Sequence, residues 1–328
     1  MRLKSILPTI LLGSLLMVAG FFVCLMEIQR GQAPSTGSTS SPQAGSEQAR
    51  PNFASQNLGG QAFLLPVSET SYLPVRDFNV PEPVLEAKAA LLFDVRSGRS
   101  LFSKNPNQRL PIASITKLMS AVIILDNLNL NDVFTVPPED INVDGKGADF
   151  YKNEQLRGTD LFKIMLIKSS NDAALAFATV AQKAGIDFVA KMNEKAQAIG
   201  MANTKFADPA GLNDHDAFST ASDLVKLVRY AARYDLISQA LRTKSVTVTS
   251  IDGRAVHNLV NTNQLLGQIP DVIMGKTGYT DSALGTMALE AGINEGRDTI
   301  ISVILGAKDR FTETEKLIQW SKTAYRWR

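Results

Sequence analysis

The sequence predicts an α/β protein of the α+β class, in which an antiparallel sheet flanked by helices is interrupted by an inserted all-helical subdomain. Strand patterns lie at both ends of the folded region, and helical patterns fill its middle. No segment repeats along the chain. Because strands from both ends can pair in one sheet, the helices between them form a separate part, with a natural cleft between the two.

The chain begins with the pattern of a membrane anchor. Residues 6–26 carry no charged side chain, and a helix of this length spans about 30 Å, the thickness of the hydrocarbon core of a bilayer. Arg2 and Lys4 precede it, which favours a cytoplasmic N-terminus and a domain on the other side. No convincing cleavage site follows, so we predict that residues 1–30 form a cytoplasmic stub and a transmembrane anchor. A cleaved signal peptide is the alternative.

A linker is predicted after the anchor. Residues 31–84 are rich in Ser, Gly and Pro, which predicts a flexible tether. The last part, residues 61–84, has scattered aromatic side chains and is expected to lie against the domain surface without regular structure. Folded sequence is expected from residue 85 to residue 328.

The folded domain opens on a β-hairpin. In residues 87–105, two apolar strands flank a turn at residues 96–98. Helical periodicity then predicts a series of helices, the last with a capping-box-like start at Thr220 and Asp223; they cover residues 113–126, 159–167, 171–184, 186–199 and 219–234. A final amphipathic helix is expected from about Glu313. It follows apolar strands at residues 244–250, 272–280, 285–293 and 299–307.

Composition removes several kinds of chemistry. A net charge of +2, without a run of like charges, gives no basic surface for nucleic acid. Cys24 is the one cysteine of the chain and lies in the apolar N-terminal run, so an internal disulfide cannot form. The two histidines, His215 and His257, are too few for a Cys/His zinc site, and neither adjoins a nucleophile elbow. We predict ordinary surface or hydrogen-bonding histidines.

Ser114 and Lys117 are the first candidates for catalysis, at the start of the helix that follows Pro111. Residues i and i+3 share a helix face, so hydroxyl and amine can meet. A lysine that acts as a base must be neutral, which requires its pKa to fall from about 10.4 toward 7, a change of about 4–5 kcal/mol. A helix N-terminus also favours an oxyanion. Alone, however, S-x-x-K is common by chance, and this apolar helix is equally typical of a protein core.

Two further motifs place polar side chains where they can face the predicted cleft. Ser169 and Asn171 lie between two predicted helices, where they can relay a proton and hold a carbonyl or the lysine amine, or simply cap a helix. Lys276, Thr277 and Gly278 lie on a predicted strand. On an edge strand, the lysine and the hydroxyl can bind a carboxylate, and the glycine leaves room for substrate backbone. A solvated lysine and a β-bulge are the alternative.

The three motifs occur in the order and context of a known superfamily. S-x-x-K opens a helix, S-x-N follows about 55 residues later between helices, and K-T-G lies on a strand about 107 residues beyond that. The sequence resembles the serine penicillin-binding protein and β-lactamase superfamily, and most closely the low-molecular-mass D-alanyl-D-alanine carboxypeptidases of peptidase family S11. The blocks that carry this likeness cover nearly all of residues 85–310; they are "LPIASITKLMSA", "FADPAGLNDHDAFSTASDL", "NTNQLL" and "GKTGYT".

The resemblance implies a role for each motif residue. Ser114 would be the acyl-enzyme nucleophile, Lys117 its general base, and Ser169 the group that passes the proton onward. The substrate would be bound by a second set of residues, Asn171, Lys276, Thr277, Gly278 and Tyr279. In this set Asn171 would orient the substrate, and Lys276 and Thr277 would bind its terminal carboxylate. The backbone N–H groups of Ser114 and Tyr279 would form the oxyanion hole. No metal and no cofactor is implied.

The resemblance also implies a β-lactamase/transpeptidase-like fold and a serine peptidase catalytic domain over residues 85–328. Such a domain would remove the terminal D-alanine of peptidoglycan stem peptides, and β-lactam antibiotics would inhibit it covalently. The anchor would hold it on the periplasmic or extracellular side of the bacterial cytoplasmic membrane. An endopeptidase that cuts peptidoglycan crosslinks with the same residues is one alternative. An inactive scaffold that binds the cell wall is another, from a different class.

The sequence departs from the family pattern in several places. Ser170 stands where a glycine is expected within S-x-N, and Gly275 directly precedes Lys276 instead of lying one place earlier. Residues 206–219 contain no glutamate to activate a deacylating water, so efficient β-lactam hydrolysis is not expected. The acidic residues of this segment are Asp208, Asp214 and Asp216. The segment after the last strand is too short for the C-terminal β domain of many relatives, and we expect the anchor to replace its membrane role.

Overall fold

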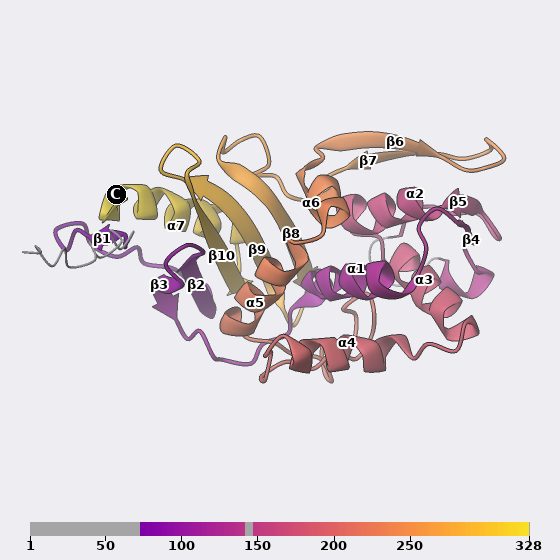
Figure 1. Ribbon diagram of the computed structural model, residues 1–328, viewed down its shortest axis with the longest axis horizontal. Helices are drawn as coiled ribbons and strands as arrows, with labels where there is room; N and C mark the ends of the chain where they lie inside the picture. Colours follow the sequence, from indigo (N-terminus) through magenta and orange to yellow (C-terminus); the bar gives the residue numbers. More distant parts are fainter. Residues whose placement is uncertain (1–72, 142–146, 328) are drawn as a thin grey trace, which may run out of the picture. The chain divides into compact units, whose positions relative to one another are not determined.

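A five-stranded antiparallel sheet is the frame of the fold (Figure 1). The structure is a computed structural model that describes residues 73–141 and 147–327. The strand order in this sheet is β3-β2-β10-β9-β8; the strands are β2 (Ala89–Asp94), β3 (Arg99–Lys104), β8 (Val272–Thr280), β9 (Leu284–Ile293) and β10 (Asp298–Ala307). The N-terminal hairpin therefore pairs with the C-terminal strands, as predicted, through β2 and β10. Strand β8, which carries the K-T-G motif, lies at the edge.

Both faces of the sheet are covered by helices. Helix α7 (Arg310–Ala324) packs on β9 and β10 from one side, and α5 (Ala221–Ala231) packs on β2, β9 and β10 from the other. Successive residues of a strand point to opposite faces, and Leu91 and Leu92 accordingly lie in two different hydrophobic clusters. Burial on both faces explains why the central strands read as nearly continuous apolar runs.

The inserted part is mainly helical, and its predicted helices are confirmed to within a few residues. Helix α1 is buried along most of its length, from Thr116 to Ile124, and its apolar character on all sides follows from that position. Thr220 caps α5 by accepting from the Asp223 N–H, as the capping-box pattern predicted. The helical elements are η1 (Ala113–Ile115), α1 (Thr116–Asn127), α2 (Gly158–Lys163), the π-helical turn η3 (Ile164–Lys168), α3 (Asn171–Lys183), α4 (Phe188–Ala198) and α6 (Asp235–Arg242).

Two small sheets correct the expectation of an all-helical insertion. Strand β4 (Val133–Thr135) pairs with β5 (Gln155–Arg157), and β6 (Ser245–Thr249) pairs with β7 (Val256–Val260). The strand predicted at residues 244–250 therefore exists, but it forms a separate hairpin rather than extending the main sheet. In β6, serine and threonine alternate with valine, so only one of its faces can be buried. Helix α6 and the short strands β4, β5 and β7 were not predicted.

The segment before β2 is docked on the domain by its own contacts. Strand β1 (Val75–Arg76) pairs with β11 (Tyr325–Arg326), although no regular structure was expected there. The Arg76 guanidinium lies 4.8 Å from the ring centre of Trp320 and donates to the carbonyl of Val80 at 2.7 Å.

The predicted anchor, and the tether as far as residue 72, lie outside the described residues and remain predictions. Within residues 73–141 and 147–327, a single helix long and apolar enough to cross a membrane is absent. Only α3 and α4 taken together, bent by 100°, reach that length and composition.

Candidate active site

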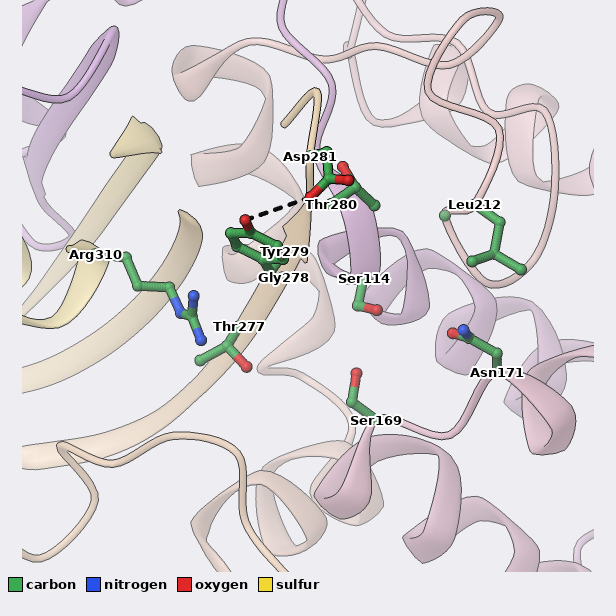
Figure 2. A pocket seen from close by; sticks show the side chains of 11 residues that line it. Ser114, Ser169, Asn171, Leu212, Thr277, Gly278, Tyr279, Thr280, Asp281 and Arg310 are labelled. Atoms are coloured by element: carbon green, nitrogen blue, oxygen red, sulfur yellow. Dashed lines mark hydrogen bonds between the residues drawn. The ribbon is translucent and has the colours of Figure 1, made fainter. Parts of the chain in front are cut away.

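A pocket of about 400 Å³ opens where the edge strand β8 faces the helical part (Figure 2). Its walls come from β8 and the turn after it, from η1, from the junction of η3 and α3, from the start of α7, and from the loop that precedes Thr220. The residues that line it are Ser114, Ser169, Asn171, Gly211, Leu212, Thr277, Gly278, Tyr279, Thr280, Asp281 and Arg310. Six of the eight predicted site residues are among them.

Lys117 is the seventh predicted residue and lies directly beneath the pocket. Its side chain is fully buried, and its Nζ lies 3.0 Å from the Ser114 Oγ. The same amine donates to the side-chain oxygen of Asn171 and to the backbone carbonyl of Ala210, each at 2.7 Å. The i, i+3 spacing thus brings hydroxyl and amine together as predicted, and two further oxygens fix the position of the amine.

Lys276 is the eighth residue and approaches the pocket from β8. Its Nζ donates to the Ser169 Oγ at 2.7 Å and to the carbonyl of Thr277 at 2.9 Å, and its side chain is 1% exposed. The alternative of a solvated lysine is therefore wrong. The Thr277 hydroxyl faces the pocket and also donates to the Thr262 hydroxyl at 2.8 Å.

Unusual backbone geometry occurs at both pocket serines. Ala113, immediately before Ser114, has φ of 47°, and Ser169 has φ of 63°. Residues other than glycine adopt this left-handed region at a cost of about 1–3 kcal/mol and do so preferentially at functional sites. In the second case the left-handed residue joins η3 to α3, and Ser170 then caps α3 by accepting from the Ala173 N–H. Ser170, which departs from the expected glycine, therefore has a structural role.

Two glycines let neighbouring backbones come close to Ser114. A Cβ on Gly278 would lie 2.9 Å from the Ser114 nitrogen and 2.5 Å from the Thr286 hydroxyl. A Cβ on Gly211 would lie only 2.0 Å from the carbonyl oxygen of Ala113. The glycine of K-T-G thus keeps β8 against the serine turn. The alternative that it marks a bulge is wrong, because the irregularity in β8 lies between Val272 and Met274.

Replacing Gly211 with alanine should displace the serine turn and lower turnover by at least about tenfold. The new methyl group collides with a backbone oxygen, and the φ of +80° is strained for any other residue. Gly185→Ala is the matched control, because its φ of +79° is equally strained but its Cβ would meet open space. Steady-state kinetics and thermal melting of both variants check this. Equal losses of activity in the two variants would show that the contact with Ala113 is unimportant.

Sequence reasoning missed two groups at this site. The Ala210 carbonyl is held toward Lys117 because the Asp208 carboxylate accepts from four backbone N–H groups of the same loop, at residues 210, 211, 212 and 213. Arg310, the first residue of α7, directs its guanidinium toward Thr277 (Figure 2). Burial lowers the pKa of Arg310, and the nearby Asp309 carboxylate partly opposes this effect. Its Nε is buried without a hydrogen-bond partner among the described residues.

The histidines lie outside the pocket lining, in agreement with the prediction that they are ordinary. His257 is buried, with one ring nitrogen 2.6 Å from a carboxylate oxygen of Glu154 and the other 3.1 Å from the Ala148 carbonyl. His215 is exposed. Neither histidine contacts Ser114, so a serine and histidine pair is not formed in the described part of the chain.

Comparison with known proteins agrees with this geometry. The family model for D-alanyl-D-alanine carboxypeptidases matches residues 76–309. The D-alanyl-D-alanine endopeptidase of Pseudomonas aeruginosa is 33% identical over 245 residues, which are 73% of this chain and 78% of that protein. The D-alanyl-D-alanine carboxypeptidase DacF of Bacillus subtilis is 30% identical over 248 residues, 73% of this chain. The match spans 63% of DacF, less than two thirds of its length.

Solved structures give the same result for the fold. The D-alanyl-D-alanine carboxypeptidase of Mycobacterium tuberculosis has 28% identity and a TM-score of 0.68, over 76% of this chain and 95% of that one. The Streptomyces K15 DD-transpeptidase has 24% identity and a TM-score of 0.69, over 74% of this chain and 100% of that one. At this lower identity the second likeness concerns the fold alone.

Proposed function

The chain belongs to the D-alanyl-D-alanine carboxypeptidase family of serine peptidases, and from this premise we propose that it removes the terminal D-alanine of peptidoglycan stem peptides. The 3.0 Å contact between Lys117 Nζ and Ser114 Oγ, beside an open pocket, carries the proposal. A hydroxyl held against a buried amine is what an acyl-transfer nucleophile and its base require. β-Lactam antibiotics would acylate the same hydroxyl.

In the proposed acylation, a neutral Lys117 accepts the hydroxyl proton while Ser114 Oγ attacks the carbonyl carbon of the penultimate D-alanine. A neutral amine has two N–H donors and one lone pair. The oxygens of Asn171 and Ala210 can take the two donors, which leaves the lone pair for the Ser114 hydroxyl. Asn171 and Ala210 therefore orient the base. The backbone N–H groups of Ser114 and Tyr279 would bind the oxyanion.

Ser169 would deliver the proton to the leaving group. Its hydroxyl lines the same pocket as Ser114 and accepts from Lys276 at 2.7 Å. In this scheme Ser169 passes the proton taken by Lys117 to the D-alanine nitrogen, and the C–N bond breaks. Water then attacks the serine ester, gives its proton to Lys117, and Ser114 regains a proton as the acyl group leaves. The enzyme returns to its starting state without a metal or cofactor in the scheme.

Arg310 extends the proposed carboxylate site. A terminal D-alanine carries a carboxylate, and a half-buried guanidinium that lines the pocket with Thr277 matches it in charge and hydrogen-bonding geometry. Lys276 bonds Ser169 and the backbone from within the wall, whereas the Arg310 side chain faces the pocket itself. We therefore assign recognition of the carboxylate to Thr277 and Arg310 together.

Replacing Arg310 with glutamine should lower kcat/KM for peptides ending in a free carboxylate by about 10- to 100-fold. A hydrogen bond to a charged group contributes about 1.5–3 kcal/mol, which corresponds to this range. The cause is checked by measuring kcat/KM for a peptide with a free C-terminal carboxylate and for the same peptide with a C-terminal amide. The wild-type protein should prefer the free carboxylate, and the variant should lose this preference. Lys308→Gln, which removes an exposed charge two residues away, is the control. An unchanged preference in Arg310→Gln would contradict the assignment.

The function itself is tested by incubating a chain that lacks residues 1–30 with a stem pentapeptide and measuring the release of free D-alanine. Stoichiometric labelling by a fluorescent penicillin is the parallel assay. A folded protein that neither releases D-alanine nor is labelled would instead be an inactive wall-binding scaffold.

Cleavage of peptidoglycan crosslinks is a second candidate function. A relative named D-alanyl-D-alanine endopeptidase, from Pseudomonas aeruginosa, is 33% identical to this chain, against 30% for the carboxypeptidase DacF. A second endopeptidase-named relative, from Escherichia coli, is 29% identical. Digestion of purified crosslinked muropeptide dimers distinguishes the two activities, because an endopeptidase converts dimers to monomers and a strict carboxypeptidase only shortens their pentapeptide ends.

We also propose that the domain is held on the outer side of the cytoplasmic membrane by residues 6–26. The support is their length without a charged side chain, after Arg2 and Lys4. Membrane fractionation of the full chain and of a chain lacking residues 1–30 tests this. Recovery of the full chain in the soluble fraction would contradict it.

A further inference from the structure

One wall of the pocket is a loop whose inner part is rigidly held. The Pro209 carbonyl accepts from the Ser120 hydroxyl at 2.6 Å, and the next carbonyl, of Ala210, accepts from Lys117. Asp208 binds the following backbone N–H groups, as described above. These contacts place Gly211 and Leu212 firmly on the pocket wall.

The outer part of the same loop lies at the surface and is joined to the opposite wall through the half-buried Asp214. Asp214 accepts a hydrogen bond from the hydroxyl of Ser282, which lies in the turn between β8 and β9. Asp216 bonds within its own loop instead, to the side chain of Asn213 at 3.0 Å. The pocket lining ends at Leu212 on one wall and at Asp281 on the other, so the contact joins the walls just beyond the pocket. We call this Asp214–Ser282 contact the rim latch.

The latch lies at the end of the pocket that would receive the acyl part of the substrate. If the terminal carboxylate lies at Thr277 and Arg310, the residues before the scissile bond must run past Ser114 toward Tyr279 and Asp281. Figure 2 shows Thr280 and Asp281 on the far side of Tyr279 from Thr277. This orientation rests on the function proposed above.

We propose that Asp214 and Ser282 are positioning residues that select for long stem peptides. By joining the two rims before substrate arrives, the latch fixes both walls at the spacing required by an extended peptide. Without the rim latch, the two rims would become ordered only when substrate binds. The cost of this ordering would weaken the binding of every substrate long enough to reach the rims. A minimal donor such as N-acetyl-D-Ala-D-Ala ends before the latch, so its turnover does not depend on it.

The test compares KM and kcat for a stem pentapeptide and for N-acetyl-D-Ala-D-Ala. Asp214→Ala and Ser282→Ala should each raise KM for the pentapeptide by about three- to tenfold, with kcat and both constants for the minimal donor unchanged. The double variant should be no worse than either single one, because both remove the same contact. Asp214→Asn keeps an acceptor oxygen and should restore the low KM. Asp216→Ala, on the same loop, is the matched control.

The outcomes separate the latch from the function on which it rests. If the wild-type protein hydrolyses both peptides but the variants match it, or match Asp216→Ala, the latch has no role in selectivity. Additive losses in the double variant, or equal losses on the two donors, would also overturn it. If the wild-type protein hydrolyses neither peptide, the proposed function fails, and the inference about substrate length fails with it.

Discussion

Replacing Ser114 with alanine is expected to lower D-alanine release by about 10⁴-fold or more and to abolish covalent labelling by penicillin. The acyl-enzyme cannot form without the hydroxyl, and loss of a nucleophile usually removes most of the catalysis that the whole catalytic set provides. The fold should persist, because Lys117 keeps its contacts with Asn171 and Ala210 when the hydroxyl is removed. Release of D-alanine, penicillin labelling and thermal melting measure the three quantities separately.

Ser103→Ala is the control for this variant, since that serine is exposed on the edge strand β3. It should be labelled and should turn over substrate like the wild-type protein. Labelling of Ser114→Ala at the wild-type rate would place the nucleophile elsewhere. Mass spectrometry of the labelled peptide would then identify the residue, and Ser169 is the first candidate because its hydroxyl lines the same pocket.

The arrangement of the site could be predicted as far as it depends on side chains in recognisable patterns. The spacing of Ser114 and Lys117 on one helix face determines their contact, since three residues make nearly one turn. The pairing of the N-terminal hairpin with the last strands follows from apolar segments that need burial on both faces. Once those strands pair, β8 is left at the edge beside the helices, which brings Lys276 to Ser169.

The rest depends on contacts that leave no pattern in the sequence. The oxygen that holds Lys117 from one side belongs to the backbone of Ala210, and any residue there would supply the same carbonyl. In the sequence, Arg310 is an ordinary charged residue near the start of an amphipathic helix. Its side chain reaches the pocket because α7 packs on β9 and β10. The left-handed conformation of Ser169 could not be predicted either, because a serine in a sequence does not indicate a positive φ.

The hairpin of β6 and β7 shows a different limit. Its residues have the alternation of a strand, so the prediction of a strand at residues 244–250 was correct. Alternation, however, specifies that one face is buried and not which neighbour buries it. Here the buried face lies over η3, and the chain enters β8 only after a further turn through residues 261–271. The main sheet therefore has five strands, and this pair stands apart from it.

Replacing Lys117 with methionine should lower both acylation by penicillin and D-alanine release by about 10³-fold or more. A positioned general base contributes about 10²–10⁴-fold, and here the same amine also fixes Asn171 and the Ala210 carbonyl. Methionine nearly fills the buried space of the lysine side chain, so we expect a large loss of activity and only a small loss of stability. Stopped-flow acylation with a chromogenic β-lactam and thermal melting measure the two effects. Lys191→Met, at a half-exposed lysine of α4 paired with Glu194, controls for the removal of a lysine charge.

Lys117→Arg separates proton transfer from charge. A guanidinium donates hydrogen bonds but does not give up its proton in proteins, so it can replace the positive charge and cannot act as the base. If Lys117 takes the proton of Ser114, this variant should be as slow as Lys117→Met, and Lys117→Ala should regain part of its activity with added small alkylamines. If the lysine served only through its charge, Lys117→Arg would retain substantial activity. A fast Lys117→Arg enzyme would therefore remove Lys117 as the base and leave Ser169 with Lys276 as the pair to be tested for that role.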